Sequence, residues 1–96
     1  MGATTFKTIS TGKTAREAFT TATQNARWNC GNSGYTGTIA EKSSFVMINV
    51  PAGKTASDYA EDLMDDGDPR IDDKYGPAGC IALGEDRFMF FGWASE

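Results

Sequence analysis

The chain has 96 residues, of which 40% are hydrophobic and 11% aromatic, with a formal net charge of −4 and a pI of about 4.7. This length predicts a single domain over residues 1–96, because typical domains run to about 100–150 residues. The acidic balance argues against direct binding to nucleic acid or to an anionic membrane, both of which attract Lys and Arg, and it favours a basic protein partner.

A strand over residues 6–10 is the first predicted element, because apolar and polar residues alternate there. A helix follows, and its start is marked by Thr14 and Glu17 in the spacing of a capping box. Small apolar residues recur at helical spacing as far as Cys30. A loop rich in Gly, Ser and Thr, residues 31–42, then leads to the next strand.

The second half of the chain begins with an almost uninterrupted apolar run over residues 45–50. Such a run predicts a central strand that is covered on both faces of the sheet. A second helix is expected to begin after Thr55, which has an acidic residue three positions later, and to end at Gly67.

Two short strands over residues 80–83 and 88–93, joined by a hairpin turn, complete the chain. The order β-α-β-α-β-β predicts an α+β fold with a roughly four-stranded sheet and both helices on one face. The last strand is apolar on both sides, so its uncovered side needs a cover, which long loops of the chain, a second copy of the chain or another protein could supply. The candidate dimer face consists of Met89, Phe91 and Trp93.

The tripeptide Gly-Lys-Thr occurs twice, at residues 12–14 and 53–55. A phosphate-binding P-loop also needs a glycine five positions earlier, where the chain has Lys7 and Ile48 instead. Both copies are therefore interpreted as a turn followed by a helix cap.

The Gly-rich loop over residues 31–42 is a candidate site for a small ligand such as a nucleotide signal. It follows a helix and precedes a strand, which is the reverse of the dinucleotide-binding arrangement. An aromatic ring, two hydroxyls and a charge pair are available from Tyr35, Thr36, Thr38, Glu41 and Lys42. The alternative is a tight structural connection that depends on glycine.

Eight of the thirteen acidic residues gather within sixteen positions: Asp58, Glu61, Asp62, Asp65, Asp66, Asp68, Asp72 and Asp73. Their spacing does not match a calcium-binding EF-hand loop, because Met64 and Arg70 occupy ligand positions. The cluster is either a solvated helix face or a patch that docks on a basic protein surface. With no histidine in the chain and no recognisable catalytic, metal or cofactor motif, we expect neither an enzyme nor a bound cofactor.

The N-terminus has no apolar run of signal-peptide length, and no segment approaches the roughly 18 apolar residues of a membrane span. We therefore expect a cytoplasmic protein that does not contact a membrane. In that compartment Cys30 and Cys80 are expected to be reduced.

Three segments, residues 34–42, 75–80 and 90–95, resemble a group of short, uncharacterised proteins from bacteriophages and related mobile elements. No activity is assigned to that group. The resemblance implies a phage-type protein that acts in the host cytoplasm, binding and inhibiting a basic host protein or a nucleoprotein complex of host defence, as an anti-CRISPR protein does. A small-ligand binder that uses the Gly-rich loop and a homodimeric structural or accessory phage protein are the alternatives.

Overall fold

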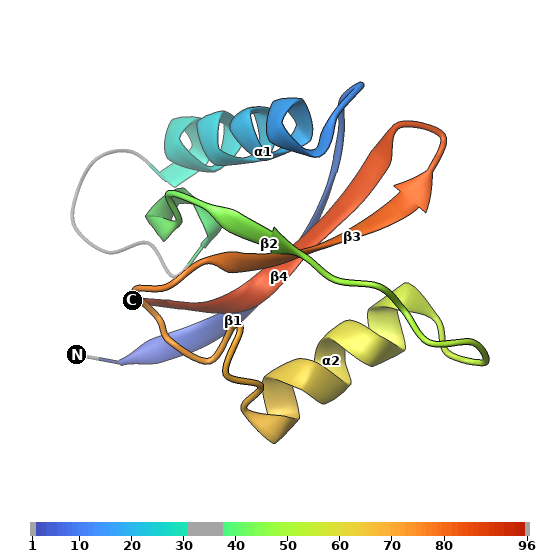
Figure 1. Ribbon diagram of the computed structural model, residues 1–96. Helices are drawn as coiled ribbons and strands as arrows, with labels where there is room; N and C mark the ends of the chain where they lie inside the picture. The colour runs from blue at the N-terminus through green and yellow to red at the C-terminus, as the bar shows by residue number, and fades with distance from the viewer. Residues whose placement is uncertain (1, 31–37, 96) are drawn as a thin grey trace.

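The computed structural model describes residues 2–30 and 38–95 of the chain (Figure 1). The elements in chain order are β1 (Ala3–Thr11), α1 (Ala15–Cys30), the 3₁₀ turn η1 (Ile39–Glu41), β2 (Phe45–Met47), α2 (Ala56–Asp66), β3 (Ala78–Gly84) and β4 (Arg87–Ser95). The predicted α+β class, the order β-α-β-α-β-β and the four strands are confirmed. In these described ranges, neither helix is long and apolar enough to cross a lipid bilayer.

The four strands form one mixed sheet in the order β1-β4-β3-β2, so that β1 and β2 are its two edges. Strand β4 is antiparallel to both of its neighbours, and β2 is parallel to β3. The prediction of a central strand over residues 45–50 is therefore wrong, because β2 has three residues and pairs on one side. The apolar run continues beyond β2 because Ile48 and Val50 pack in the cluster beneath α2.

The two helices pack on opposite faces of the sheet (Figure 1), so the prediction that both lie on one face is wrong. Cys80 and Phe90 belong to the cluster with α1, whereas Met89 and Phe91 belong to the cluster with α2. The crossover from β1 to β2 and the crossover from β2 to β3 run in opposite directions across the sheet. Two crossovers with the usual right-handed sense must then place their helices on opposite faces.

The last strand is covered on its second face by α2 of the same chain. Met89 and Phe91 are 5% and 0% exposed, and the ring nitrogen of Trp93 donates a hydrogen bond to the Met64 carbonyl over 3.3 Å. The candidate dimer face is therefore already buried within the chain, since the second helix fills the space that a second copy was expected to fill.

Local sequence signals fix the helix ends as predicted. Thr14 and Thr55 accept hydrogen bonds from the amides of Glu17 and Asp58, each over 3.1 Å, and so cap α1 and α2. Gly67 ends α2 in the left-handed conformation, with φ of 67°.

Candidate functional site

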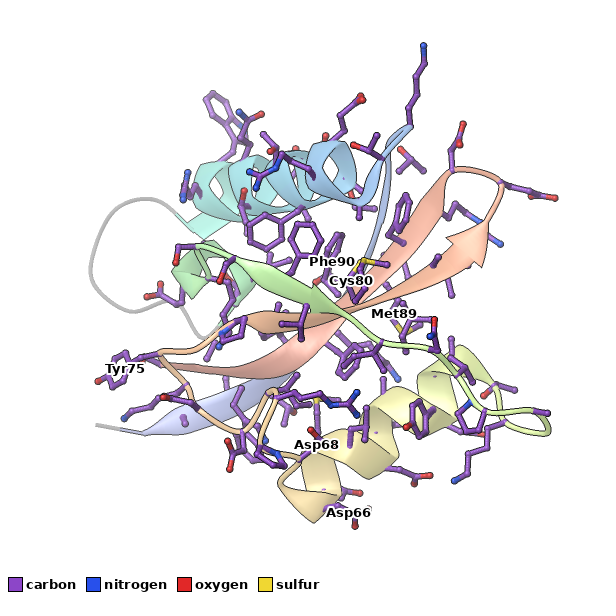
Figure 2. The ribbon with its side chains drawn as sticks, in the orientation of Figure 1. Asp66, Asp68, Tyr75, Cys80, Met89 and Phe90 are labelled. Atoms are coloured by element: carbon purple, nitrogen blue, oxygen red, sulfur yellow. The ribbon has the colours of Figure 1, made fainter. Side chains whose placement is uncertain are left out.

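The acidic residues of α2 lie on the side of the helix that faces away from the sheet. The spacing from Asp58 to Asp65 follows the i, i+3, i+4, i+7 pattern of one helix face, and the buried residues of α2 are Ala60, Leu63 and Met64. We call Asp58, Glu61, Asp62 and Asp65 the stripe. Four further acids follow the stripe in the sequence, and Figure 2 shows two of them, Asp66 and Asp68, at the C-terminal end of α2. We call the whole set the acidic face: Asp58, Glu61, Asp62, Asp65, Asp66, Asp68, Asp72 and Asp73.

Two surface lysines neutralise part of the stripe on α2. The Lys7 ammonium, from β1, lies 3.6 Å from the Glu61 carboxylate, and Lys54 forms an ion pair with Asp62. The hydrogen bond from Lys54 to that carboxylate raises the pKa of Lys54 above its ordinary value. Both pairs are partly exposed, so solvent and salt weaken them and each contributes little to stability.

Arg70 neutralises the first acid after the helix. Its Nε and Nη2 atoms each lie 3.0 Å from an oxygen of Asp68, which is a bidentate contact. These hydrogen bonds lower the pKa of the Asp68 carboxyl and raise the pKa of the Arg70 guanidinium. In the described part of the chain, the three salt bridges involve none of the five remaining acids, all of which are exposed: Asp58, Asp65, Asp66, Asp72 and Asp73.

The end of α2 places two of these acids where the helix itself disfavours them. Asp65 and Asp66 lie in the last turn, which contains no basic residue. The C-terminal end of a helix carries partial negative charge from its unpaired carbonyls, so it is stabilised by cations and destabilised by carboxylates. The sequence therefore concentrates negative charge at this point at a cost to helix stability.

Lys42 holds in place the segment that carries the last acids of the acidic face. Its side chain is 2% exposed, and its ammonium donates to the carbonyls of Asp73, Lys74 and Gly76 over 3.2, 3.3 and 2.9 Å. Burial lowers the pKa of Lys42, and the nearby charge of Asp73 partly offsets this effect. An ammonium has three donors and all three are used here, so the predicted role of Lys42 as a ligand contact is wrong.

Two other members of the candidate ligand loop, Thr38 and Glu41, lie in one short turn. Thr38 caps η1, with its hydroxyl accepting a hydrogen bond from the Ala40 amide over 3.2 Å, and Glu41 is half-buried in that same turn. Tyr35 and Thr36 lie outside the described residues. The ligand-binding role of the loop as a whole therefore stays a prediction.

A groove that sequence reasoning missed lies between β1, α1 and η1. It has a volume of about 260 Å³, and Thr38 and Ile39 are among the residues that line it. The sequence carries no signal for this groove, because its existence depends on β1 being an edge strand.

Cys80 is the one candidate nucleophile whose surroundings the structure describes. It is a free thiol with 0% exposure beneath α1, and burial raises its pKa from 9.0 to about 11. A thiol that stays protonated and covered is a poor nucleophile, so Cys80 serves as a core residue.

The raised pKa of Cys80 predicts a loss of stability at alkaline pH. Between pH 9 and 11 the thiol ionises in the unfolded chain and stays protonated in the fold, so the unfolded state is favoured as pH rises. Relative to a Cys80→Ala variant, the wild type is expected to lose about 2 kcal/mol of unfolding free energy from pH 8 to pH 11. Urea denaturation of both proteins across this range measures the difference, and parallel pH profiles would contradict the prediction.

Within residues 2–30 and 38–95, no group of three or more His, Cys, Asp or Glu side chains is arranged to hold a metal ion. Comparison of the chain with protein-family models, with curated proteins and with solved structures found no match. The acidic face, defined by its geometry and charge, is thus the best candidate site.

Proposed function

We propose that this chain is a phage-type interaction protein that inhibits a host nucleic-acid-handling or defence complex. In this proposal the acidic face binds the basic surface that the complex otherwise uses for nucleic acid, and the protein acts in the host cytoplasm. The resemblance of three segments to short bacteriophage proteins supports a phage-type protein that acts in a host cell. The acidic face supports the chemistry, because nuclease complexes hold nucleic acid in positively charged channels.

The observation that carries the proposal is the position of Asp65 and Asp66. A solvated helix face needs no acid in the last turn, where carboxylates oppose the helix dipole. Docking on Lys or Arg side chains would make these two charges favourable, because a cation of the partner would interact with both the carboxylates and the negative end of the helix dipole.

This position predicts opposite effects of one double substitution on stability and on binding. Asp65→Asn together with Asp66→Asn is expected to raise the free energy of unfolding by about 0.5–1 kcal/mol at low salt, because Asn has a similar helix propensity without the charge. The gain is expected to shrink as salt is added. Urea denaturation at 20 mM and 500 mM NaCl measures it, and an unchanged or lowered stability at low salt would contradict the assignment.

Inhibition is tested with purified bacterial RNA-guided nuclease complexes, with DNA cleavage as the readout. The wild type is expected to reduce cleavage less at high salt, and the Asp65→Asn, Asp66→Asn variant is expected to need about tenfold more protein for the same effect. The matched control is Glu85→Gln with Asp86→Asn, which removes the same charge at the β3–β4 turn, away from α2. Equal inhibition by the two double variants would count against the proposal. So would a lack of inhibition by the wild type.

Neither alternative has comparable support. The groove beside α1 has a smaller volume than the roughly 300–1,000 Å³ of typical small-ligand pockets, and its described lining contains no Lys or Arg to neutralise a phosphate. The face predicted to form a homodimer is covered by α2.

A further inference from the structure

The outer edge of β1 carries a row of backbone groups that point away from the sheet. The register between β1 and β4 is uninterrupted, and the Gly12 amide donates to the Asp86 carbonyl over 2.9 Å just beyond its end. In an antiparallel ladder, residues alternate between directing both backbone groups at the partner strand and directing both away from it. Counting back from Gly12, the residues of β1 with outward N–H and C=O groups are Ala3, Thr5, Lys7, Ile9 and Thr11.

This edge is long and is not protected in the ways that exposed strands usually are. β1 has nine residues and no proline, whereas β2, at the other edge, has three. Charged side chains often shield an edge, but the Lys7 ammonium is drawn across the sheet face to Ser57 Oγ, 2.7 Å away, and towards Glu61. No hydrogen bond to the outward backbone groups of β1 occurs within the described residues.

The groove between β1 and α1 lies along this same edge. Three consecutive residues of β1, Thr8, Ile9 and Ser10, line it together with Ala22 and Ala26 of α1. Alternate side chains of a strand point to opposite faces, so the side chain of Ile9 points away from α1 while those of its neighbours point toward it. The main chain of Ile9 therefore borders the groove, and its apolar wall on the helix side consists of Ala22 and Ala26.

We propose that this edge and groove bind an extended peptide segment of another protein, which adds to the sheet as a fifth, antiparallel strand. The outward N–H and C=O groups of β1 match an extended main chain, which offers the complementary groups at the same spacing. One small aliphatic side chain of the peptide packs against Ala22 and Ala26. The volume of about 260 Å³ leaves ample room for such a side chain and lies below the roughly 300–1,000 Å³ of typical small-molecule pockets.

A second copy of this chain is a poorer occupant than a foreign peptide. If β1 of a second copy paired with this edge, the side of it that faces the groove would present Thr4, Phe6, Thr8 and Ser10. Phe6 is the single large apolar residue among them, and it is 8% exposed because it packs in the core of its own chain beneath α1. The copy would thus leave the apolar wall of the groove unfilled.

The rim of the groove offers positions for a matched pair of blocking variants. Asn25 is exposed and lines the groove, whereas its neighbour Gln24 is exposed and does not line it. Trp28 is 89% exposed and lies three residues beyond Asn25, which makes the two neighbours on the helix surface. An exposed tryptophan beside a groove is typical of protein-binding surfaces.

The first test is amide hydrogen exchange by NMR on the full chain. In the free protein the amides of Lys7 and Ile9 are expected to exchange fast, whereas those of Phe6 and Thr8, bonded to β4, are expected to be protected. Fast exchange on alternate residues would support the open edge. Protection of all four amides in a concentrated sample, together with a dimer in light scattering, would mean that a second copy occupies the edge and would overturn the proposal.

The second test uses a fully randomised octapeptide library displayed on phage, selected on the immobilised full chain. The enriched peptides are expected to carry an aliphatic residue within a β-forming sequence, and a synthesised peptide is expected to protect the amides of Lys7 and Ile9. Asn25→Trp and Ile9→Pro, which removes one outward N–H, are each expected to weaken peptide binding about tenfold, and Gln24→Trp is expected to bind like the wild type.

The controls separate this inference from the proposed function. The Asp65→Asn, Asp66→Asn variant is expected to bind the peptide like the wild type, since the acidic face takes no part. Retained protection of the Phe6 and Thr8 amides shows that each variant is folded. The proposal is overturned if no peptide is enriched, if a bound peptide leaves Ile9 exchange unchanged, or if Asn25→Trp and Gln24→Trp weaken binding equally.

Discussion

Replacing Lys42 by methionine is expected to lower the free energy of unfolding by about 3 kcal/mol, because three carbonyls lose their donor. Methionine keeps most of the side-chain length, but it offers no hydrogen to the carbonyls of Asp73, Lys74 and Gly76. Removing the ammonium also relieves the desolvation that lowers the pKa of Lys42, and this gain offsets part of the loss. The loss outweighs it because the carbonyls of Lys74 and Gly76 lose a donor at a cost of about 1–3 kcal/mol each, whereas the Asp73 carbonyl keeps the Gly76 amide, 2.9 Å away, as a donor.

Urea denaturation of the variant and the wild type measures the effect, and Lys13→Met is the matched control. Lys13 is exposed and makes no salt bridge within the described residues, so its replacement is expected to change stability by less than about 0.5 kcal/mol. An unfolding midpoint for Lys42→Met equal to that of Lys13→Met would show that the three hydrogen bonds contribute nothing to stability.

Lys42→Met is also expected to affect the part of the acidic face that follows α2. Lys42 fixes the backbone at residues 73–76, directly after Asp72, so its loss is expected to speed amide exchange over residues 68–77 more than in α1. If the acidic face binds a basic partner, Lys42→Met is also expected to weaken inhibition, since Asp72 and Asp73 are then held less firmly. Uniform acceleration of exchange across the whole chain would instead indicate global destabilisation alone.

Gly79→Ala is expected to cost about 2–3 kcal/mol through a steric clash in the core beneath α2. Gly79 faces Phe91 in the register of β3 and β4, and a Cβ at this position would lie 2.6 Å from Cζ of the Phe91 ring. The ring is 0% exposed and packed in the cluster with α2, so it cannot move aside without disturbing its neighbours.

A double-mutant cycle with Phe91→Leu tests whether this clash is the cause. In the Phe91→Leu background the ring is absent, so Gly79→Ala is expected to cost at least about 1 kcal/mol less than in the wild type. Denaturant unfolding of the four proteins gives the coupling energy. Additive effects would mean that the cost of Gly79→Ala does not come from the clash with the Phe91 ring.

The groove and the Lys42 hydrogen bonds escaped sequence reasoning for a common physical reason. Lys42 and the carbonyl of Asp73 are 31 positions apart, and β1 meets α1 at the groove only because β1 is an edge strand. Sequence periodicity reports which residues share a face of one element, and it does not report which element lies beside another. Part of the acidic face could be predicted from the sequence, because the stripe from Asp58 to Asp65 belongs to a single helix and follows from helix spacing alone.

By itself the sequence determined the order of strands and helices, the helix starts at Thr14 and Thr55, and the end of α2 at Gly67. Each of these depends on hydrogen bonds between residues a few positions apart, whose partners the local sequence specifies. The tertiary structure alone decided that the helices cover opposite faces, that β1 and β2 are edges, and that Met89 and Phe91 are buried. These outcomes depend on strand order, which is settled by packing between distant segments and by the right-handed sense of the crossovers.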